Sequence, residues 1–426
     1  MVFVSRSKAN FWVFTDMIKL LHTSDWHIGA KLNGISRADD HTAFFEWLVE
    51  TVTSEKITAL LVAGDIFDTA QPSAESEALY YECLVALGKS SLREIVILGG
   101  NHDSAARLEA PKAVLKALNV HVVARYLKDH DENLLVPLHE ADGSVGAVVV
   151  ALPFVNEFRL GVRTTGVDSD SLRATIADKF RVLYSQLCDR SIELYGDLPM
   201  IGMGHLTVGG DVKSDDSPLQ VHMVGTIGGL PVSVFDERLR YVALGHIHRM
   251  LPVQTGDTRE VWYSGTPIPV RFSEARIDRK ALVVTVDDSN TYHPKSLTIP
   301  ESRQLLEFRG DFDSVNSSIS SLVNSATLPA LLKITLEVDQ FQATLTSQLN
   351  DTLDRRFEGE ELRPLIADIV QVTSAAVKRS EGEVAVIKRD EMNPISVFEQ
   401  LCDWQGEDFD ELRPLLEQLI QSSAEA

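Results

Sequence analysis

Five short polar motifs in the first 250 residues carry side chains that can bind metal ions or transfer protons. They contain, in chain order, Asp25 and His27, Asp65, Asn101 and His102, His205, and finally His246 and His248. Each motif directly follows an apolar run. Carboxylate, amide and imidazole groups without thiolates suit manganese, iron or zinc at reactive sites rather than a structural zinc. The residue types therefore indicate metal chemistry.

Seven of these side chains are candidate metal ligands: Asp25, His27, Asp65, Asn101, His205, His246 and His248. Seven ligands are too many for one ion that keeps an open coordination position, but they suit two ions that share one carboxylate. In such sites two ions about 3.5 to 4 Å apart activate a water molecule and neutralise charge during in-line displacement at a phosphoryl group. The motifs thus predict a metal-assisted reaction on phosphate.

Two polar residues of the third motif are left after the ligands are assigned. His102 lies next to a candidate ligand and is free to face the substrate, where an imidazole can protonate the leaving oxygen. Asp103 either orients the imidazole of His102 or caps the following helix, and both interpretations stay open. Gly100 lets the backbone approach the site closely. We therefore expect His102 to be catalytic and Asp103 to support the site.

The elements that position these motifs alternate between strand and helix. Apolar runs indicate strands over 18–21, 57–63, 95–98, 200–204 and 241–244, and amphipathic segments indicate helices over 41–52, after 72–73, and over 105–118 and 171–187. Two further strands, 120–123 and 146–152, are expected in the second layer of a sheet sandwich. In α/β sheets ligands gather beyond the carboxyl ends of the strands. The pattern therefore predicts an α/β fold that brings the motifs together.

The chain of 426 residues is long enough for two or three domains. We expect the α/β domain over 17–300, a small α+β module over 303–380 and a helical segment over 381–426. In the small module, strands are expected near 305–308 and over 331–338, with a helix over 312–324 between them. Residues 1–16 are interpreted as an N-terminal extension or a start-site artefact, because their apolar part is too short for a signal peptide and no cleavage site follows. The two amphipathic helices of the tail either cap the core or dock on a partner.

Composition limits the setting in which the protein acts. Three widely separated cysteines indicate neither a disulfide framework nor a thiolate zinc site, which fits a cytoplasmic location. The longest apolar run, 145–155, is too short to span a bilayer. The net charge of −22 should repel a polyanion, so nucleic-acid binding would need metals, a partner or a local basic face. Candidates for that face are Arg249, Arg271, Arg276, Arg279 and Lys280.

The motifs resemble those of a known family. Asp-x-His, Gly-Asp, Gly-Asn-His-Asp, a later Gly-His and Gly-His-x-His are the signature of calcineurin-like metallophosphoesterases. The strings His22–Gly29, Ala63–Asp68 and Ala243–Arg249, with Gly265–Pro269 after them, are more closely similar to the SbcD family, the nuclease subunits of bacterial SbcC–SbcD DNA repair complexes. The resemblance is strong over about 17–279, whereas the small module and the tail match in layout more than in letters.

The resemblance implies two bound metal ions, expected to be Mn2+. One ligand set is Asp25, His27 and His248, the other is Asn101, His205 and His246, and Asp65 bridges them. The resemblance also assigns the proton-donating or transition-state role to His102. Archaeal and eukaryotic relatives carry a second histidine three positions after the bridging residue, where this chain has Asp68. An aspartate is not an imidazolium at neutral pH, so that role is not transferred.

The activity that the resemblance implies is that of a manganese-dependent DNA nuclease, a double-strand exonuclease and single-strand or hairpin endonuclease in DNA repair, recombination and replication. It further implies an SbcC-type ATPase as partner, a homodimer of the nuclease subunit, a cap over 303–380 that shapes the DNA path, and docking of the tail on the coiled-coil base of the ATPase. The alternative is a phosphomonoesterase or cyclic-nucleotide phosphodiesterase with the same ligands. A catalytically inactive scaffold is disfavoured, because no candidate ligand has been replaced.

Overall fold

The computed structural model describes residues 18–127, 131–162, 167–209, 229–287, 290–342, 344–373 and 413–414. The chain divides into two compact units, Met1–Leu336 with Ala343–Val370 and Glu337–Gln342 with Gln371–Ala426. The extension predicted over 1–16 lies outside the described residues, as does the helical segment predicted over 381–426 except for the pair 413–414.

The first sheet has six strands in the order β14-β13-β1-β4-β5-β6. Their bounds are β1 Lys19–Thr23, β4 Ala59–Ala63, β5 Glu94–Leu98, β6 Val120–Val123, β13 Lys280–Val286 and β14 Tyr292–Thr298. Strands β1, β4, β5 and β6 run parallel, whereas β13 is antiparallel to β1 and to β14. The strand at 120–123 thus belongs to this layer, and its prediction in the second layer is wrong, because strands that follow one another usually pair.

The second sheet also has six strands, in the order β11-β12-β10-β9-β8-β7. Their bounds are β7 Leu135–His139, β8 Val145–Leu152, β9 Met200–His205, β10 Leu239–Gly245, β11 Leu251–Pro252 and β12 Glu260–Tyr263. Strands β8, β9, β10 and β12 run parallel, and β7 and β11 pair antiparallel at the two edges. The run predicted over 146–152 does lie in this second layer.

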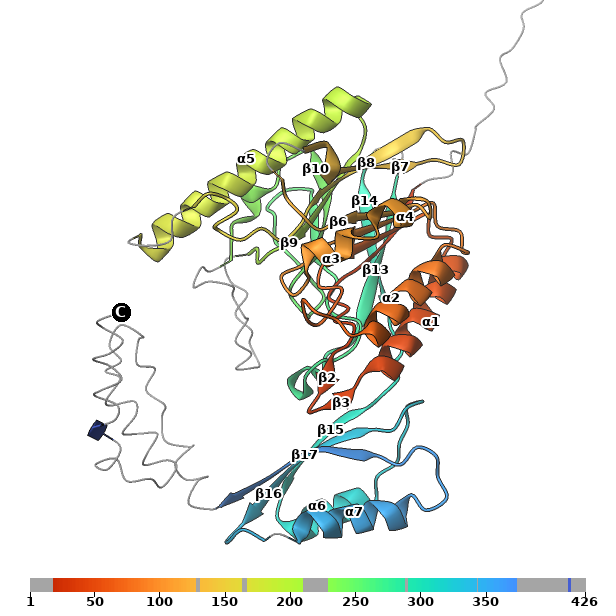
Figure 1. The fold of residues 1–426 in the computed structure, drawn as a ribbon, viewed down its shortest axis with the longest axis vertical. Helices are drawn as coiled ribbons and strands as arrows, with labels where there is room; N and C mark the ends of the chain where they lie inside the picture. The colour runs from red at the N-terminus through yellow and green to blue at the C-terminus, as the bar shows by residue number, and fades with distance from the viewer. Residues whose placement is uncertain are drawn as a thin grey trace, which may run out of the picture. The chain divides into compact units, whose positions relative to one another are not determined.

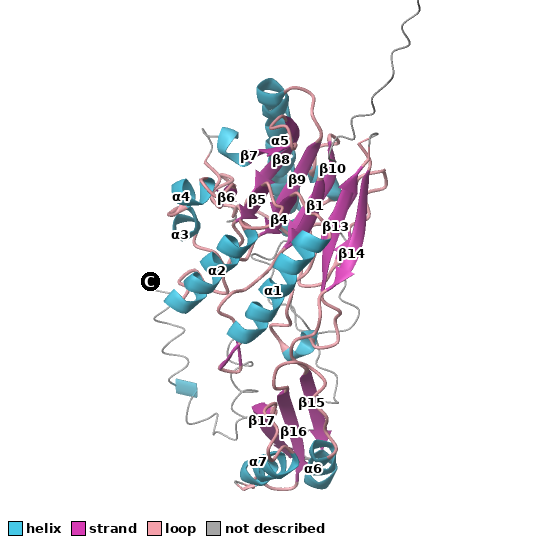
Figure 2. Ribbon diagram, turned by 90° about the vertical axis from the view of Figure 1, so that its right-hand side faces the viewer, coloured by secondary structure: helices cyan, strands magenta, loops and turns pink. Residues whose placement is uncertain are grey.

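Helices flank the two sheets (Figure 1). Helices α1 (Ala38–Ser54) and α2 (Ala74–Leu87) lie beside the first sheet, and the long helix α5 (Ser169–Tyr195) lies along the second. Figure 2 shows the strands of both layers side by side. The predicted α/β fold, a β-sandwich with helices around it, is therefore confirmed.

Alternating side chains along each strand build two cores. On β4, Leu61 packs in the core between the sheets, whereas Leu60 packs in the core beneath α1 and α2. Leu48 of α1 joins the outer core, and Tyr184 of α5 joins the core of the second sheet. Successive side chains of a strand point to opposite faces, so a run that is apolar throughout is buried on both sides. The double burial makes the strand ends a rigid frame for the site.

The helix predicted over 105–118 is broken into two short helices, α3 (Ala105–Glu109) and α4 (Lys112–Lys116). Pro111 stands at the break, as the N-cap of α4. Proline lacks a backbone N–H donor, so position 111 cannot donate the hydrogen bond that would continue the helix. The remaining short elements are β2 Lys31–Leu32, β3 Ile35–Ser36, and the 3-10 turns η1 Asp131–Leu134, η2 Val232–Val234 and η3 Phe272–Glu274.

A small α+β module follows the sandwich. It has a three-stranded sheet in the order β15-β16-β17 and two helices, with bounds β15 Leu305–Gly310, α6 Phe312–Ser320, β16 Leu331–Val338, α7 Leu345–Arg356 and β17 Leu365–Thr373. Val315 and Ile319 on α6 and Leu349 and Leu353 on α7 are buried. Their spacing of four residues places each pair on one face of its helix. The strands predicted near 305–308 and 331–338 are present, and the helix predicted between them ends at Ser320.

Among the described helices none is both long and apolar enough to cross a membrane.

Candidate metal centre

Aligned strand ends bring the five motifs together. In the first sheet, Thr23 at the end of β1 pairs with Val62 of β4, and Ala63 pairs with Leu98 at the end of β5. In the second sheet His205, the last residue of β9, pairs with the last residue of β10. Because parallel strands in register end at the same edge, the loops that follow them meet there. Each of the seven predicted ligands and His102 comes from one of these loops or strand ends.

Four of the predicted ligands have a backbone conformation that side chains disfavour. The φ angles are 51° at Asp25, 49° at His27, 49° at Asp65 and 94° at His246. Such conformations cost about 1 to 3 kcal/mol each and persist where the surrounding structure holds them. The first two loops are fastened together, since the amide of Asp25 donates to the carbonyl of Gly64 at 2.9 Å and that of His27 to the carbonyl of Asp65 at 3.0 Å. Strain at four candidate ligands marks these loops as functional.

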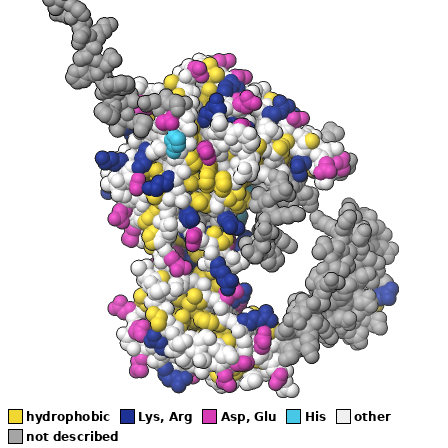
Figure 3. All heavy atoms as spheres, turned by 180° about the vertical axis from the view of Figure 1, so that it is seen from behind, with side chains coloured by type: hydrophobic (Ala, Val, Ile, Leu, Met, Phe, Trp, Pro, Cys, Tyr) yellow, Lys and Arg dark blue, Asp and Glu magenta, His cyan; other side chains and the backbone are white. Residues whose placement is uncertain are grey.

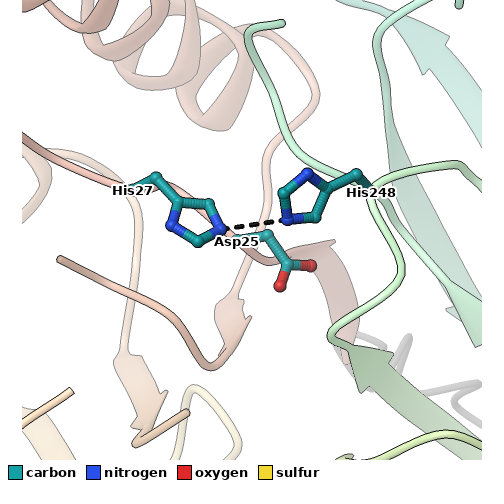
Figure 4. A group of neighbouring side chains, drawn as sticks. All are labelled: Asp25, His27 and His248. Carbon is teal, nitrogen blue, oxygen red and sulfur yellow. Dashed lines mark hydrogen bonds between the residues drawn. The ribbon is translucent and has the colours of Figure 1, made fainter. Parts of the chain in front are cut away.

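The first group of candidate ligands is Asp25, His27 and His248 (Figure 4). One ligand atom of each lies within 4.8 Å of the other two. The two imidazoles face one another with their Nε2 atoms 3.0 Å apart. Asp25 is fully buried, and its Oδ1 accepts a hydrogen bond from the amide of His246 at 2.8 Å. The loop after β10 is thereby joined to the loop after β1.

The second group is Asp65, His205 and His246. His205 Nε2 lies 3.3 Å from Asp65 Oδ2. The side-chain oxygen of Asn101 lies 3.0 Å from His205 Nε2 and 3.0 Å from His246 Nδ1, so the amide belongs to the same group. His205 Nδ1 faces the backbone carbonyl of Ala63 at 2.9 Å. A carbonyl only accepts, so Nδ1 carries the proton and Nε2 of the neutral ring is free for a metal.

His102 lies against both groups. It forms a third cluster with His27 and Asp65, in which one ligand atom of each lies within 4.8 Å of the others. The amide of His102 donates to Asp65 Oδ1 at 2.9 Å, and its Nδ1 donates to the carbonyl of Asp68 at 2.8 Å. The ring is half-buried, whereas Asp65 and His27 are buried. His102 is thus placed at the solvent side of the clustered ligands.

Burial and neighbouring charges set the protonation of the metal-free group. Burial lowers the pKa of His205, but the carboxylates of Asp65 and Asp25 outweigh it and raise that pKa to about 9. Burial also acts to raise the pKa of Asp65, yet His205 and His27 hold it below its ordinary value. Burial, together with the charge of His205, lowers the pKa of His246 to about 3. The buried carboxylates therefore bind positive charge, which a cation can supply in place of a proton.

The donors present fit divalent metal ions. Two imidazole lone pairs 3.0 Å apart, as at His27 and His248, repel unless a proton or a cation lies between them. Two nitrogen ligands at right angles, each about 2.0 to 2.1 Å from a metal, would lie about 3 Å apart. The set of carboxylate, imidazole and amide oxygen without thiolate suits manganese, iron or zinc. Both the spacing and the chemistry of the side chains are therefore those of a metal site.

Gly100 and Asp103 connect the second and third loops. A Cβ atom at Gly100 would collide with the backbone and carboxylate of Asp65, so the close approach requires glycine. The Asp103 carboxylate accepts from the amides of Gly100, Ile66 and Phe67 at 2.9, 3.1 and 3.0 Å. Neither alternative for Asp103 is correct. Among the described residues, its carboxylate accepts no hydrogen bond from the His102 ring or from an amide at the start of the following helix. Three backbone amides supply the buried carboxylate with three hydrogen bonds, whereas one imidazole N–H would supply only one.

One residue of the predicted basic face is not on the surface. Arg279 is 9% exposed, and its guanidinium donates to the carbonyl of His248 at 3.2 Å and to that of Glu274 at 2.6 Å. The prediction that Arg279 belongs to a DNA-facing surface is wrong. Its guanidinium is buried and donates hydrogen bonds to two backbone carbonyls instead. Arg249 and Arg276 are exposed.

Sequence reasoning missed one carboxylate at this site. Glu274 Oε1 lies 2.9 Å from Nδ1 of His248, and the glutamate is 2% exposed. It stands 26 positions after the histidine in a polar stretch, so no local pattern marks it. Asp68 Oδ1 lies 3.4 Å from Nδ1 of His27. Two carboxylates thus lie behind the two histidines of the first group.

Comparison with known proteins identifies the relatives of this chain. The family model described as calcineurin-like phosphoesterase matches residues 18–250. The chain is 34% identical to the SbcD subunit of nuclease SbcCD from Rhodobacter capsulatus over 79% of this chain and 84% of that protein. It is 32% identical to the SbcD subunit of nuclease SbcCD from Escherichia coli K12 over 76% of this chain and 79% of that protein. The chain therefore belongs to the calcineurin-like phosphoesterases and, within them, to the SbcD family of nuclease subunits.

Proposed function

We propose that this chain is the nuclease subunit of a DNA-processing complex, a metal-dependent phosphodiesterase that acts as a double-strand exonuclease and as an endonuclease on single strands and hairpins. The observation that carries the proposal is the convergence of six candidate ligands and His102 in overlapping clusters that share His27 and Asp65, with Asn101 in contact with His205 and His246. Membership of the SbcD family supports DNA as the substrate. The expected processes are repair, recombination and replication in the cytoplasm.

We assign Asp25, His27 and His248 to one cation, Asn101, His205 and His246 to a second, and Asp65 to both, with Mn2+ as the expected ion. When bound, the ions supply an activated water and positive charge at the phosphodiester. The bridging assignment of Asp65 is supported by its place between the groups, since its Oδ2 lies 3.3 Å from His205 Nε2 and 3.9 Å from His27 Nε2.

The protein's own residues orient the substrate and move the proton. His102 Nδ1 donates to the carbonyl of Asp68, which fixes the ring and leaves Nε2 as the nitrogen that can reach a substrate. In its protonated form the ring can give the Nε2 proton to the leaving oxygen of the scissile phosphodiester. Asp103 holds the backbone amides at Gly100 and Phe67, so the loop that carries His102 keeps its position. His102 is therefore the proposed general acid.

The small module and the tail favour a nuclease over a phosphatase that acts on small substrates. We propose that the module at 303–380 acts as a cap that shapes the DNA path and that the segment 381–426 docks on an SbcC-type ATPase, with the nuclease subunit forming a homodimer. A phosphatase for small esters has no evident use for either part. The alternative activity, that of a phosphomonoesterase or cyclic-nucleotide phosphodiesterase, would use the same ligands. A comparison of substrates therefore distinguishes it from a nuclease.

The charge distribution predicts weak DNA binding by the isolated subunit. The chain has a net charge of −22, and on the face drawn in Figure 3 lysine, arginine, aspartate and glutamate are interspersed. The described residues on that face form no concentrated basic patch, so few phosphate contacts can form there, and salt weakens those few. We therefore expect DNA affinity that is low without the ATPase and that falls with salt. Tight, salt-resistant binding by the subunit alone would contradict this expectation.

The decisive experiment compares substrates. The full chain, with and without its ATPase partner, is incubated in Mn2+ with an end-labelled DNA hairpin, with linear duplex DNA and with a chromogenic phosphomonoester. We expect cleavage of the hairpin and of duplex ends, strengthened by the partner. An Asp65→Asn variant, which loses the proposed bridging carboxylate, serves as the inactive control. Hydrolysis of the small ester alone would overturn the nuclease proposal in favour of the phosphomonoesterase.

A further inference from the structure

Glu274 lies directly behind one of the candidate metal ligands. It ends the 3-10 turn η3 and is 2% exposed. Its Oε1 lies 2.9 Å from Nδ1 of His248, and its Oε2 accepts from the amide of Val270 at 3.0 Å. A buried carboxylate is costly unless its oxygens are paired. Both oxygens are paired here: Oε1 with the imidazole of a candidate ligand, and Oε2 with the Val270 amide and, at 3.5 Å, with Arg279 Nη2.

The contact decides which nitrogen of His248 faces the site. A carboxylate accepts hydrogen bonds, so Nδ1 of the ring carries the proton that points to Glu274. Nε2 of the neutral ring then holds the lone pair, and Nε2 is the atom that lies 3.0 Å from Nε2 of His27. Hydrogen bonding of the rear nitrogen to a carboxylate fixes the tautomer of a metal-binding histidine and raises its basicity.

The other histidines lack an equally close carboxylate behind them. Nδ1 of His205 faces the backbone carbonyl of Ala63 at 2.9 Å, which fixes the tautomer without adding negative charge. Nδ1 of His27 has no hydrogen-bond partner among the described residues and lies 3.4 Å from Asp68 Oδ1, beyond the usual hydrogen-bond length. Among the candidate histidine ligands in the described chain, His248 is thus the one whose rear nitrogen, Nδ1, is hydrogen-bonded to a carboxylate.

The fold around Glu274 is held by other contacts as well. Arg279 donates to the backbone carbonyl of Glu274 at 2.6 Å and to that of His248 at 3.2 Å. These bonds fasten the two backbone segments together without the glutamate side chain. A glutamine at position 274 keeps the size of the side chain and one acceptor oxygen but removes the charge. The substitution Glu274→Gln therefore removes the charge that faces His248, together with the ion pair between Glu274 Oε2 and Arg279 Nη2 at 3.5 Å, while both carbonyl bonds of Arg279 can remain.

We propose that Glu274 is a positioning residue that holds His248 with Nε2 toward the metal and makes the Asp25, His27 and His248 half of the site bind its divalent ion more tightly. The inference rests on the metal assignment of the proposed function. It predicts that charge removal at Glu274 weakens one ion and leaves the ion assigned to Asn101, His205 and His246 in place.

The test measures Mn2+ binding to the chelator-stripped full chain by titration calorimetry, without DNA. We expect two ions in the wild type and, in Glu274→Gln, a loss of about 10- to 100-fold in affinity for one of them. The matched control is Glu94→Gln. Glu94 is buried and its Oε1 lies 2.7 Å from Nδ1 of His139, the same chemistry at the opposite end of β5 from the site. This control should leave both affinities unchanged.

A second measurement needs no variant. In wild-type protein labelled with 15N at histidine and stripped of metal, the nitrogen shifts of His248 should report the tautomer protonated at Nδ1. Wild-type affinity of Glu274→Gln for both ions, or the opposite tautomer at His248, would overturn the inference while leaving the nuclease proposal untouched. Failure of the wild type to bind Mn2+ would instead overturn the proposed function and this inference with it.

Discussion

The carboxylate of Asp40 holds the guanidinium of Arg303 across 263 positions of the chain, with Arg303 Nε donating to its two oxygens at 3.1 and 2.9 Å. Asp40 also accepts from Arg37 at 2.8 Å. All three side chains are at most 4% exposed. The outer bonds reach the backbone, since Arg303 donates to the carbonyl of Pro329 and Arg37 to that of Pro269. One buried carboxylate therefore connects α1 to the segment that enters the small module.

Removal of one partner from this buried network should destabilise the protein strongly. Arg303→Met keeps the apolar stem but leaves the buried carboxylate of Asp40 with fewer donors. We expect a loss of about 3 to 5 kcal/mol in the free energy of unfolding, measured by urea denaturation. The control is Arg181→Ala, from a pair with Asp178 whose side chains are 58% and 71% exposed, which should change stability by less than about 0.5 kcal/mol. Equal effects of the two substitutions would show that the network adds no stability.

The substitution Gly100→Ala should disable the site without unfolding the chain. The added methyl group would collide with the carboxylate of Asp65, the proposed bridging ligand. A displacement of about 1 Å at a reacting centre can cost about 100-fold in rate. We therefore expect at least that loss in DNA cleavage, with weaker Mn2+ binding in calorimetry.

The control for Gly100→Ala is Gly88→Ala, at the exposed end of α2, where the backbone is already helical with φ −65°. This variant should keep wild-type cleavage. If Gly100→Ala binds and cleaves as the wild type does, the close approach of the third loop to Asp65 is not needed for function.

The clustering of the candidate ligands was predictable because their positions follow from one periodic rule. Parallel strands end at the same edge of a sheet. The polar residues that directly follow the strands therefore lie together at that edge, whatever the lengths of the helices between the strands. The cluster of Asp65, His205 and His246 is an example, since its first two members stand 140 positions apart in the chain. Local sequence and elementary topology were enough for this part of the site.

The supporting residues were not predictable, because long-range packing alone decides their contacts. Glu274 and Arg279 lie in a polar stretch typical of a surface, and only the turn η3 brings them under His248. The sequence allowed two local roles for Asp103, but its carboxylate instead accepts hydrogen bonds from backbone amides of another loop. The edge strand β14 also gave little signal, because Pro294 and several exposed polar residues interrupt its alternation.

The substitution His102→Gln should keep both metal ions and lose turnover. Glutamine cannot deliver a proton to a leaving oxygen, and general acid catalysis is worth about 100- to 10,000-fold in rate. We expect a loss in that range in Mn2+-dependent hairpin cleavage, while calorimetry reports two ions as in the wild type. Because one nitrogen of His102 lies near Asp65 and His27, loss of an ion would show that His102 is a ligand instead.

Acidification should destabilise the metal-free protein through His22. This histidine of β1 is fully buried between the hydroxyl of Tyr241, 2.8 Å from Nδ1, and the carbonyl of Leu244, 3.2 Å from Nε2. Burial outweighs the carbonyl contact and lowers its pKa from 6.5 to about 3. Below pH 6.5 the unfolded chain therefore binds a proton that the folded chain does not. The free energy of unfolding should fall by about 1.4 kcal/mol per pH unit from this residue alone.

The variant His22→Asn isolates that contribution, because other buried histidines such as His41 also have a lowered pKa. Asparagine keeps an acceptor for Tyr241 but has no titrating group. We expect lower stability than the wild type at pH 7.5 and a shallower decline between pH 6.5 and 4.5, with the slope reduced by about 1.4 kcal/mol per unit in urea denaturation with chelator present. Parallel curves for the two proteins would mean that His22 takes up its proton equally in the folded and unfolded chain, because only a difference in protons bound makes stability depend on pH.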